Sequence, residues 1–254
     1  MATSKKATDA LNSLASTRRT SMTEKAVFQL HKRVMHGLHS LGILRFQSGG
    51  QHDFAYDGEI LLRAIYDTSL QATYILRDPK FREARAERYL NYAWVEMDRL
   101  RTWADTSTSA LARQVRPSPL KKHGEPELDR NLKRLGKTYK TKKGGWHDAW
   151  YKGKAAAGEK QAGSLRDVAR EVGVEEEYDF LQRQLSAAVH SSPSSLARQP
   201  LIGEGHLLTL AWHFAFRVLA LLLKYYDLDA ERAGLTHEEY EVIESSMGSS
   251  LSAS

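Results

Sequence analysis

An arginine and a histidine stand two helical turns apart in residues 178–193, at Arg183 and His190. Side chains seven positions apart on an α-helix leave the same face, roughly 10 Å from each other. Ser186 lies between them on that face. Arginine can bind a phosphate and histidine can move a proton, and RNA supplies its own 2′-hydroxyl nucleophile. The spacing therefore predicts Arg183, Ser186 and His190 as catalytic residues of an RNA-cleaving site.

His190 directly precedes Ser-Ser-Pro, so it is expected at the end of its helix. The helix dipole there favours the protonated imidazole, which suits an acid or base near neutral pH. One helix presents a single Arg–His pair, whereas a two-fold homodimer would supply both an acid and a base. In the alternative interpretation, Arg183 pairs with Asp179 or Glu176 and His190 only caps the helix.

Four segments resemble known all-α proteins, and together they span roughly residues 55–195. They are residues 61–67, residues 74–78, residues 150–151 followed by 164–169, and residues 185–192. The helix order and the Arg183-Gln184 pair followed by His190 are similar to the HEPN superfamily, many members of which are metal-independent ribonucleases in toxin–antitoxin and phage-defence systems. The chain also resembles an uncharacterised bacterial family of unknown function. The HEPN resemblance implies His190 as general acid or base and Arg183 as phosphate ligand.

Glu59, Arg63 and Asp67 follow at four-residue steps and share one face of a helix. On the surface they would form an ordinary ladder of ion pairs. Facing inward, they could orient Arg63 towards the same cleft as His190. We name these three as supporting residues of the predicted site.

The net charge of +6 is concentrated in the middle of the chain. Residues 113–160 contain 14 Lys and Arg against 5 Asp and Glu, so the remainder is slightly acidic. A basic segment interleaved with aromatic residues suits a single-stranded nucleic acid, while the alternative is a solvated lysine-rich loop. The predicted nucleic-acid-binding residues are Lys133, Arg134, Lys137, Lys140, Lys142, Lys143 and Trp146. For Trp150 the resemblance favours a core position, because one of the resembling segments begins there.

A metal site is not expected. The histidines His31, His36, His39 and His52 lack the spacing of a metal-binding helix, and His31 is expected at the surface. The absence of cysteine excludes disulfides, thiolate ligands and cysteine nucleophiles. We therefore expect no metal and no cofactor.

Apolar periodicity predicts an all-α fold, a bundle of four to five long helices plus short helices with a basic loop-rich insertion. The expected helices cover residues 24–45, 53–77, 79–104, 125–136, 164–172, 175–190, 204–226 and 237–247. In the first helix, Thr23 is the expected N-cap, and the apolar stripe is Val27, Leu30, Val34, Leu38 and Leu41. In the second helix, the expected apolar positions are Ile60, Leu61, Ala64, Tyr66 and Leu70.

These elements predict a flexible segment at residues 1–22, a single helical domain at 23–248 with its insertion at about 113–163, and a disordered tail at 249–254. The N-terminus does not read as a secretory signal. The apolar run 207–223 contains His213 and Arg217, which favours a core helix over a membrane span. We expect a cytoplasmic protein without a membrane partner.

Three functions fit this sequence. The first is a metal-independent endoribonuclease of HEPN type that binds RNA and acts as a homodimer. The second is a non-catalytic helical module that binds nucleic acid or a nucleotide. The third is an interaction protein whose partner is another protein, such as an antitoxin or a defence effector.

Overall fold

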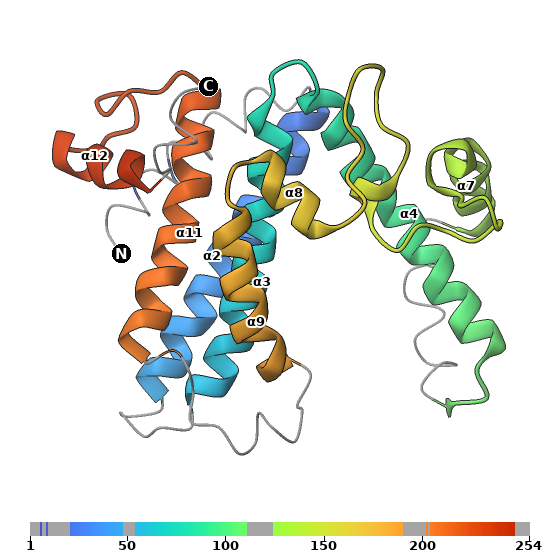
Figure 1. The fold of residues 1–254 in the computed structure, drawn as a ribbon, viewed down its shortest axis with the longest axis horizontal. Coiled ribbons are helices and arrows are strands. Elements are labelled where there is room, and N and C mark those ends of the chain that lie inside the picture. Colours follow the sequence, from blue (N-terminus) through green and yellow to red (C-terminus); the bar gives the residue numbers. More distant parts are fainter. Residues whose placement is uncertain are drawn as a thin grey trace. The chain divides into compact units, whose positions relative to one another are not determined.

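The computed structural model describes residues 6, 9, 21–47, 54–110, 124–189, 202 and 204–246 of the chain. These residues form eight α-helices and one short 3-10 helix, and they contain no strand (Figure 1). The helices are α2 (Met22–Gln47), α3 (Phe54–Arg77), α4 (Arg82–Thr106), α7 (Glu125–Tyr139), η1 (Trp150–Lys152), α8 (Leu165–Glu171), α9 (Glu175–Val189), α11 (Glu204–Tyr225) and α12 (His237–Ser245). The predicted all-α fold is confirmed, and the helix ends lie within a few residues of those expected.

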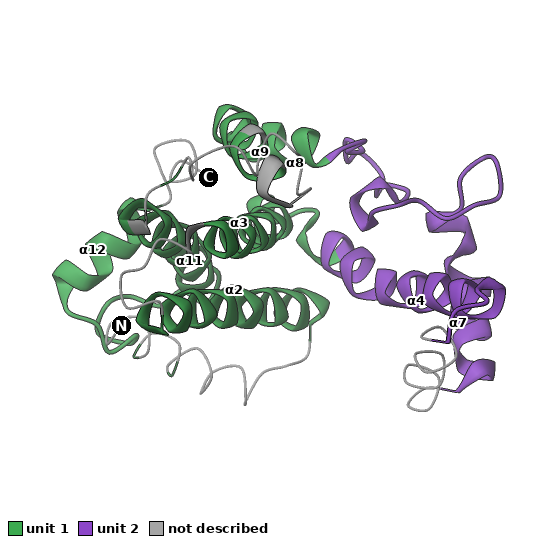
Figure 2. Cartoon of the chain, turned by 90° about the horizontal axis from the view of Figure 1, so that it is seen from below, with its two compact units in different colours: residues 1–83, 165–254 green, residues 84–164 purple. Residues whose placement is uncertain are grey.

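The chain divides into two compact units, which Figure 2 shows in green and purple. Unit 1 comprises residues 1–83 and 165–254, and unit 2 comprises residues 84–164. The basic segment lies within unit 2, together with nearly all of α4. Unit 2 therefore begins well before the charge pattern changes, because α4 is balanced in charge but packs with the basic segment.

The core of unit 1 is centred on α3, which packs against α2, α8, α9 and α11. All five residues of the predicted α2 stripe are buried, which confirms that expectation. Gly37 of α2 is required by close packing, since a Cβ atom there would lie 2.7 Å from Cγ1 of Ile65. The helices approach too closely for a larger residue at this position.

The predicted apolar face of α3 was partly wrong. Ile60 and Ala64 are exposed, whereas Leu62, Ile65 and Ser69 are buried. Because other helices cover α3 on several sides, its apolar residues do not form the single stripe that periodicity analysis assumes.

The N-terminus of α2 is also capped differently from the prediction. Ser21 is the N-cap, because its hydroxyl accepts from the Glu24 N–H at 3.0 Å and the Glu24 carboxylate accepts from the Ser21 N–H at 3.2 Å. Thr23 instead lies inside the first turn, and its hydroxyl donates to the carboxylate of Glu83 at 2.6 Å. That carboxylate also accepts the backbone N–H groups of Met22 and Thr23. Glu83 thereby ties the start of α4 to the start of α2.

Unit 2 is built on α4, α7 and the loop segment that follows α7. The buried face of α7 consists of Leu128, Leu132, Leu135 and Tyr139. The Tyr139 hydroxyl donates to the carbonyl of Arg88 at 2.6 Å, which fixes the end of α7 against α4. Trp150 is buried, as the resemblance implied.

An ion triad is buried at the centre of unit 2. The fully buried side chain of Glu159 accepts from Nε of Arg85 at 2.8 Å and from Nη2 of Arg88 at 2.6 Å. It also accepts from the Ala156 N–H at 2.9 Å. Burial alone would raise the pKa of Glu159, but the hydrogen bonds from Arg88, Ala156 and Arg85 hold it below the ordinary value. The charged carboxylate is therefore the form that the fold selects.

We expect Glu159→Gln to lower the free energy of unfolding by about 3–5 kcal/mol at neutral pH, because two buried guanidinium groups lose their counter-charge. A pKa that folding lowers contributes stability above the pKa of the unfolded chain, and this contribution is lost as pH falls through the folded-state pKa. Thermal unfolding of the full chain should thus show a difference between wild type and variant that shrinks in acid. Glu96→Gln, at an exposed position on α4, the helix that carries Arg85 and Arg88, is the control. Equal stability of Glu159→Gln and wild type at neutral pH would contradict the analysis.

Candidate functional site

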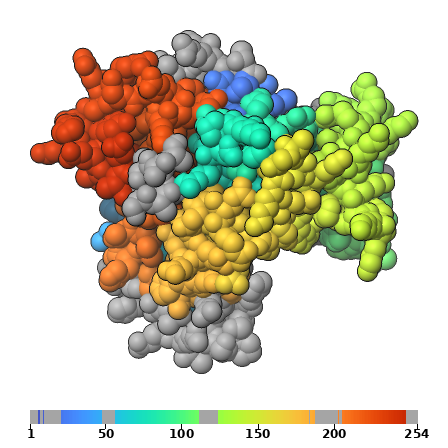
Figure 3. Space-filling view, turned by 45° about the horizontal axis from the view of Figure 1, so that its top comes forward, coloured from blue at the N-terminus to red at the C-terminus, as the bar shows by residue number. Residues whose placement is uncertain are grey.

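The helix α9 forms as predicted and ends at Val189, one residue before His190. Its buried residues Tyr178, Leu181 and Leu185 pack it on unit 1, where it contacts α3 and α8. Figure 3 shows α8 and α9 as one solvent-facing surface of that unit. Ser186 is half-buried in α9. His190 and the side chain of Arg183 lie outside the described residues, so the predicted catalytic pair stays a prediction.

Two acidic residues were expected as alternative partners of Arg183. Asp179 accepts a hydrogen bond from Nη2 of Arg166 on α8. Glu176 is exposed. The carboxylate of Asp179 is therefore already engaged by a cation from a neighbouring helix.

The supporting ladder on α3 faces the interior of unit 1. Glu59 is only 4% exposed, and its carboxylate accepts from the Ile202 N–H at 3.3 Å. Nε of Arg63 donates to Asp67 at 2.9 Å, and the Arg63 guanidinium lies 5.7 Å from the ring centre of Tyr178. Burial raises the pKa of the Asp67 carboxyl, although Arg63 opposes the shift. Glu59 is thus buried, and Arg63 and Asp67 are half-buried. The three residues do not form the exposed ladder of ion pairs that was one of the two interpretations.

A second ion pair lies close to this ladder and joins α9 to α11. Arg217 is 4% exposed and donates from both terminal nitrogens to the two carboxylate oxygens of Glu177, each at 2.7 Å. Nη2 of Arg217 also lies 2.9 Å from Nε2 of His213. Since Arg217 can only donate, the His213 nitrogen accepts and the imidazole is neutral. Burial and the Arg217 charge accordingly lower the pKa of His213.

The hydroxyl of Tyr66 is affected by the charges of both ion pairs. Burial raises the pKa of Tyr66, and the charges of Glu177, Arg217, Asp67 and Arg63 all act on it. We call the six residues from three helices the polar cluster: Arg63, Tyr66, Asp67, Glu177, His213 and Arg217. Several of its buried atoms have no hydrogen-bond partner among the described residues, namely Arg63 Nη1, Tyr66 Oη, Asp67 Oδ1 and Arg217 Nε. The cluster thus offers cations, a carboxyl that holds its proton more firmly than usual and spare hydrogen-bonding capacity.

Four of the six cluster residues were not predicted as site residues from the sequence, namely Tyr66, Glu177, His213 and Arg217. One feature of the sequence could have revealed them. Arg217 is a charged residue in the most apolar stretch of the chain. Such a residue requires a buried partner, and Glu177 is that partner.

The basic residues on and after α7 form an exposed surface on unit 2. The periodicity of α7 buries its leucines and turns Lys133, Arg134 and Lys137 to solvent. A tight turn follows, closed by a bridge between Lys140 and Trp146 and by Thr141 N–H donating to the Gly145 carbonyl. Gly144 has a φ of 84°, a conformation that favours glycine, and the turn exposes Lys142 and Lys143.

We call Lys133, Arg134, Lys137, Lys140, Lys142 and Lys143 the basic surface. Each is exposed, and none forms an ion pair with a residue that the structure describes. Trp146 is half-buried, and its indole N–H donates to the Asp98 carboxylate at 2.7 Å. The Lys140 ammonium lies over the Trp146 ring, 5.3 Å from the ring centre. Trp146 therefore anchors the turn to α4 and holds one of the cations in place.

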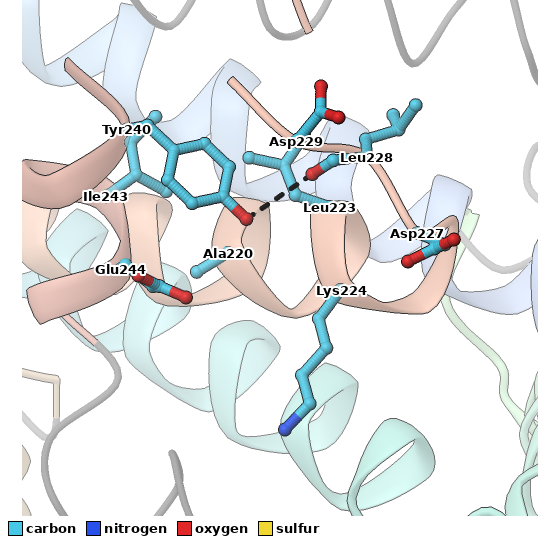
Figure 4. A pocket seen from close by; sticks show the side chains of 9 residues that line it. All are labelled: Ala220, Leu223, Lys224, Asp227, Leu228, Asp229, Tyr240, Ile243 and Glu244. Carbon is cyan, nitrogen blue, oxygen red and sulfur yellow. Dashed lines mark hydrogen bonds between the residues drawn. The ribbon is translucent and has the colours of Figure 1, made fainter. Parts of the chain in front are cut away.

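Other parts of the described chain are less suited to a polyanion. A hollow of about 280 Å³ between the end of α11 and α12 is lined by Asp227, Asp229 and Glu244, with Lys224 at its edge (Figure 4). Tyr240 closes it by donating to the Leu228 carbonyl at 3.3 Å.

No group of three or more His, Asp or Glu side chains suited to a metal ion occurs among the described residues.

His31 is buried, contrary to the expectation of a surface position. Residue 31 falls inside the apolar stripe of α2, one turn after Val27 and one turn before Val34. It is 1% exposed, and burial lowers its pKa to about 4. His36 and His39 are exposed, and His52 lies outside the described residues.

Of the described helices, α11 is the one long and apolar enough to cross a membrane, over Gly205–Tyr225. The core helix of a water-soluble domain has the same length and composition. In this chain, 61% of its most apolar stretch is buried inside the protein, and α11 packs against α3 and α2.

The Arg217–Glu177 pair can be tested by truncating the acid. We expect Glu177→Ala to lower the free energy of unfolding by about 3 kcal/mol, because it leaves a buried guanidinium without its counter-charge. Chemical unfolding of the full chain measures this loss. Glu176→Ala, next to it but exposed, should change stability by less than about 0.5 kcal/mol. Comparable losses in the two variants would show that the pair is not a determinant of stability.

Comparison with known proteins gives a family. A model described as a family of unknown function (DUF5677) matches residues 24–204, from α2 to the start of α11 and through all of unit 2. No curated protein and no solved structure matches the chain. Because the match covers well over half of its length, the chain belongs to the DUF5677 family, whose function is unknown.

Proposed function

We propose that this protein binds RNA through the basic surface of unit 2. The observation that supports the proposal is the set of six exposed cations without ion-pair partners among the described residues. Elsewhere in unit 2, arginines such as Arg85, Arg88 and Arg101 are matched by carboxylates. Cations that a fold leaves unmatched are available to neutralise phosphates, and the release of counterions then drives binding.

The binding proposal predicts that a triple variant, Lys140→Glu, Lys142→Glu and Lys143→Glu, loses affinity for RNA. Affinity for single-stranded RNA should fall by roughly tenfold or more, and the slope of log affinity against log salt should drop by about 2, because each lost phosphate contact removes about 0.7. Fluorescence anisotropy over a salt series measures both quantities.

A control triple matches this change in charge. Lys32→Glu, Arg33→Glu and Lys80→Glu alter exposed cations of unit 1 by the same amount. The control should retain most of the salt slope. If both triples weaken binding equally, net charge rather than the basic surface is responsible, and the proposed interface is wrong.

We propose further that the bound RNA is cleaved by metal-independent chemistry of HEPN type. The helix α9 supports this proposal, since one continuous helix carries the backbone of Arg183 and Ser186 and ends beside His190. His190 would move the proton and Arg183 would bind the phosphate, as the HEPN resemblance implies. Two copies of the chain would supply the acid and the base together.

This second proposal is tested by His190→Ala, which should reduce cleavage of RNA in EDTA by about 10²–10⁴-fold, the usual contribution of a general acid or base. RNA binding should be unchanged, because the basic surface is intact. His36→Ala, an exposed histidine on α2, is the control and should cleave at the wild-type rate. Cleavage that persists in His190→Ala, or that requires a divalent ion, excludes the assignment.

A further inference from the structure

A cavity of about 330 Å³ lies within unit 2, between α4, the end of α7 and residues 154–156. Its size falls in the range of small-molecule sites. Its polar lining consists of Glu87, Arg88, Asn91, Arg134, Thr138 and Lys154. Leu135, Tyr139 and three alanines (Ala84, Ala155 and Ala156) supply the apolar wall.

The cavity has an excess of positive charge. Arg88, Arg134 and Lys154 line it, and Glu87 is the one carboxylate among the described residues of the lining. Behind Arg88, the single carboxylate of Glu159 serves both Arg85 and Arg88. Counting these residues gives four cations and two carboxylates, so the site has a net charge of +2.

The cations that line the cavity are only partly satisfied. Nη2 of Arg134 donates to amide oxygens, Asn91 at 3.0 Å and Asn131 at 3.3 Å, and to no described carboxylate. Lys154 has no ion pair with a described residue. Arg88 is 93% buried, and its Nε has no partner in the described structure. Cations in a half-enclosed hollow attract an anion more strongly than those on the open surface.

The backbone around the cavity is held in place before any ligand binds. Tyr139 donates to the Arg88 carbonyl, and the Lys154 N–H donates to the Thr138 carbonyl at 2.8 Å. Gly153 lies against the Tyr139 ring, where a Cβ atom would approach within 2.7 Å. Binding would therefore cost little reorganisation.

We propose that this cavity binds a phosphate monoester, either on a free mononucleotide or at the end of an RNA strand. A monoester carries about −1.5 to −2 charges at neutral pH, which matches the excess of +2, whereas an internal diester carries one. Arginine side chains bind phosphate oxygens bidentately, and Asn91, Thr138 and Glu87 can bind adjacent hydroxyl groups. The strand-end form rests on the proposed RNA binding, and the mononucleotide form does not.

The first experiment uses calorimetry of the full chain with the four ribonucleoside 5′-monophosphates and the matching nucleosides. At least one monophosphate should bind tenfold or more tightly than its nucleoside. Lys154→Ala and Arg134→Ala should each remove most of this ratio. Lys160→Ala, an exposed lysine of the same unit that lies outside both the cavity and the basic surface, should preserve it.

The second experiment compares 5′-phosphorylated and 5′-hydroxyl RNA strands of one sequence by anisotropy. Lys142→Ala should weaken both strands equally, whereas Lys154→Ala should abolish the preference for the phosphorylated strand. If the preference occurs in the first experiment alone, the ligand is a free mononucleotide. If it occurs in the second alone, the ligand is the phosphorylated end of an RNA strand. The proposal is overturned if neither experiment shows a preference, or if the preference survives both Lys154→Ala and Arg134→Ala. Because overall RNA affinity is measured in the same assay, failure of the cavity is distinguishable from failure of the basic surface.

Discussion

Guanidinium groups that leave water must meet carboxylates, and this constraint organises both units of the chain. In unit 1, Arg217 on α11 meets Glu177 on α9. In unit 2, Arg85 and Arg88 on α4 meet Glu159 in the loop that follows η1. Each pairing joins segments far apart in the sequence, and each is costly to break because the remaining charge is buried. The first fixes α9, and the second fixes the wall of the cavity between α4 and α7.

The two units use charge in opposite ways. In unit 1, the described acids around α8 and α9 are matched by Arg166, Arg170 and Arg217, so much of its charge is satisfied internally. Unit 2 matches its buried arginines but leaves the cations of α7 and the following turn to solvent. A surface of this kind is expensive to assemble unless an external anion compensates it. The contrast supports a division of labour in which unit 2 binds a polyanion.

The proposed chemistry belongs to unit 1, where α9 leads to His190 and packs beside the polar cluster. Burial raises the pKa of the Asp67 carboxyl and lowers that of the His213 imidazole, because it penalises the charged form of each group. The DUF5677 family model matches residues 24–204, a range that contains both α9 and the basic surface of unit 2.

The sequence by itself determined the helices and their ends, the α2 stripe, the span of α9 and the basic segment, because periodicity, capping residues and charge are local properties. It could also nominate Arg63 and Asp67 by their spacing. Only the tertiary structure decided which way they face. The cap at Ser21 and the burial of His31 follow from local patterns that the prediction missed, the Ser21–Glu24 capping box and the apolar stripe of α2. Partners forty or more residues apart, such as Arg217 with Glu177 and Arg85 with Glu159, depend on packing that no local pattern records.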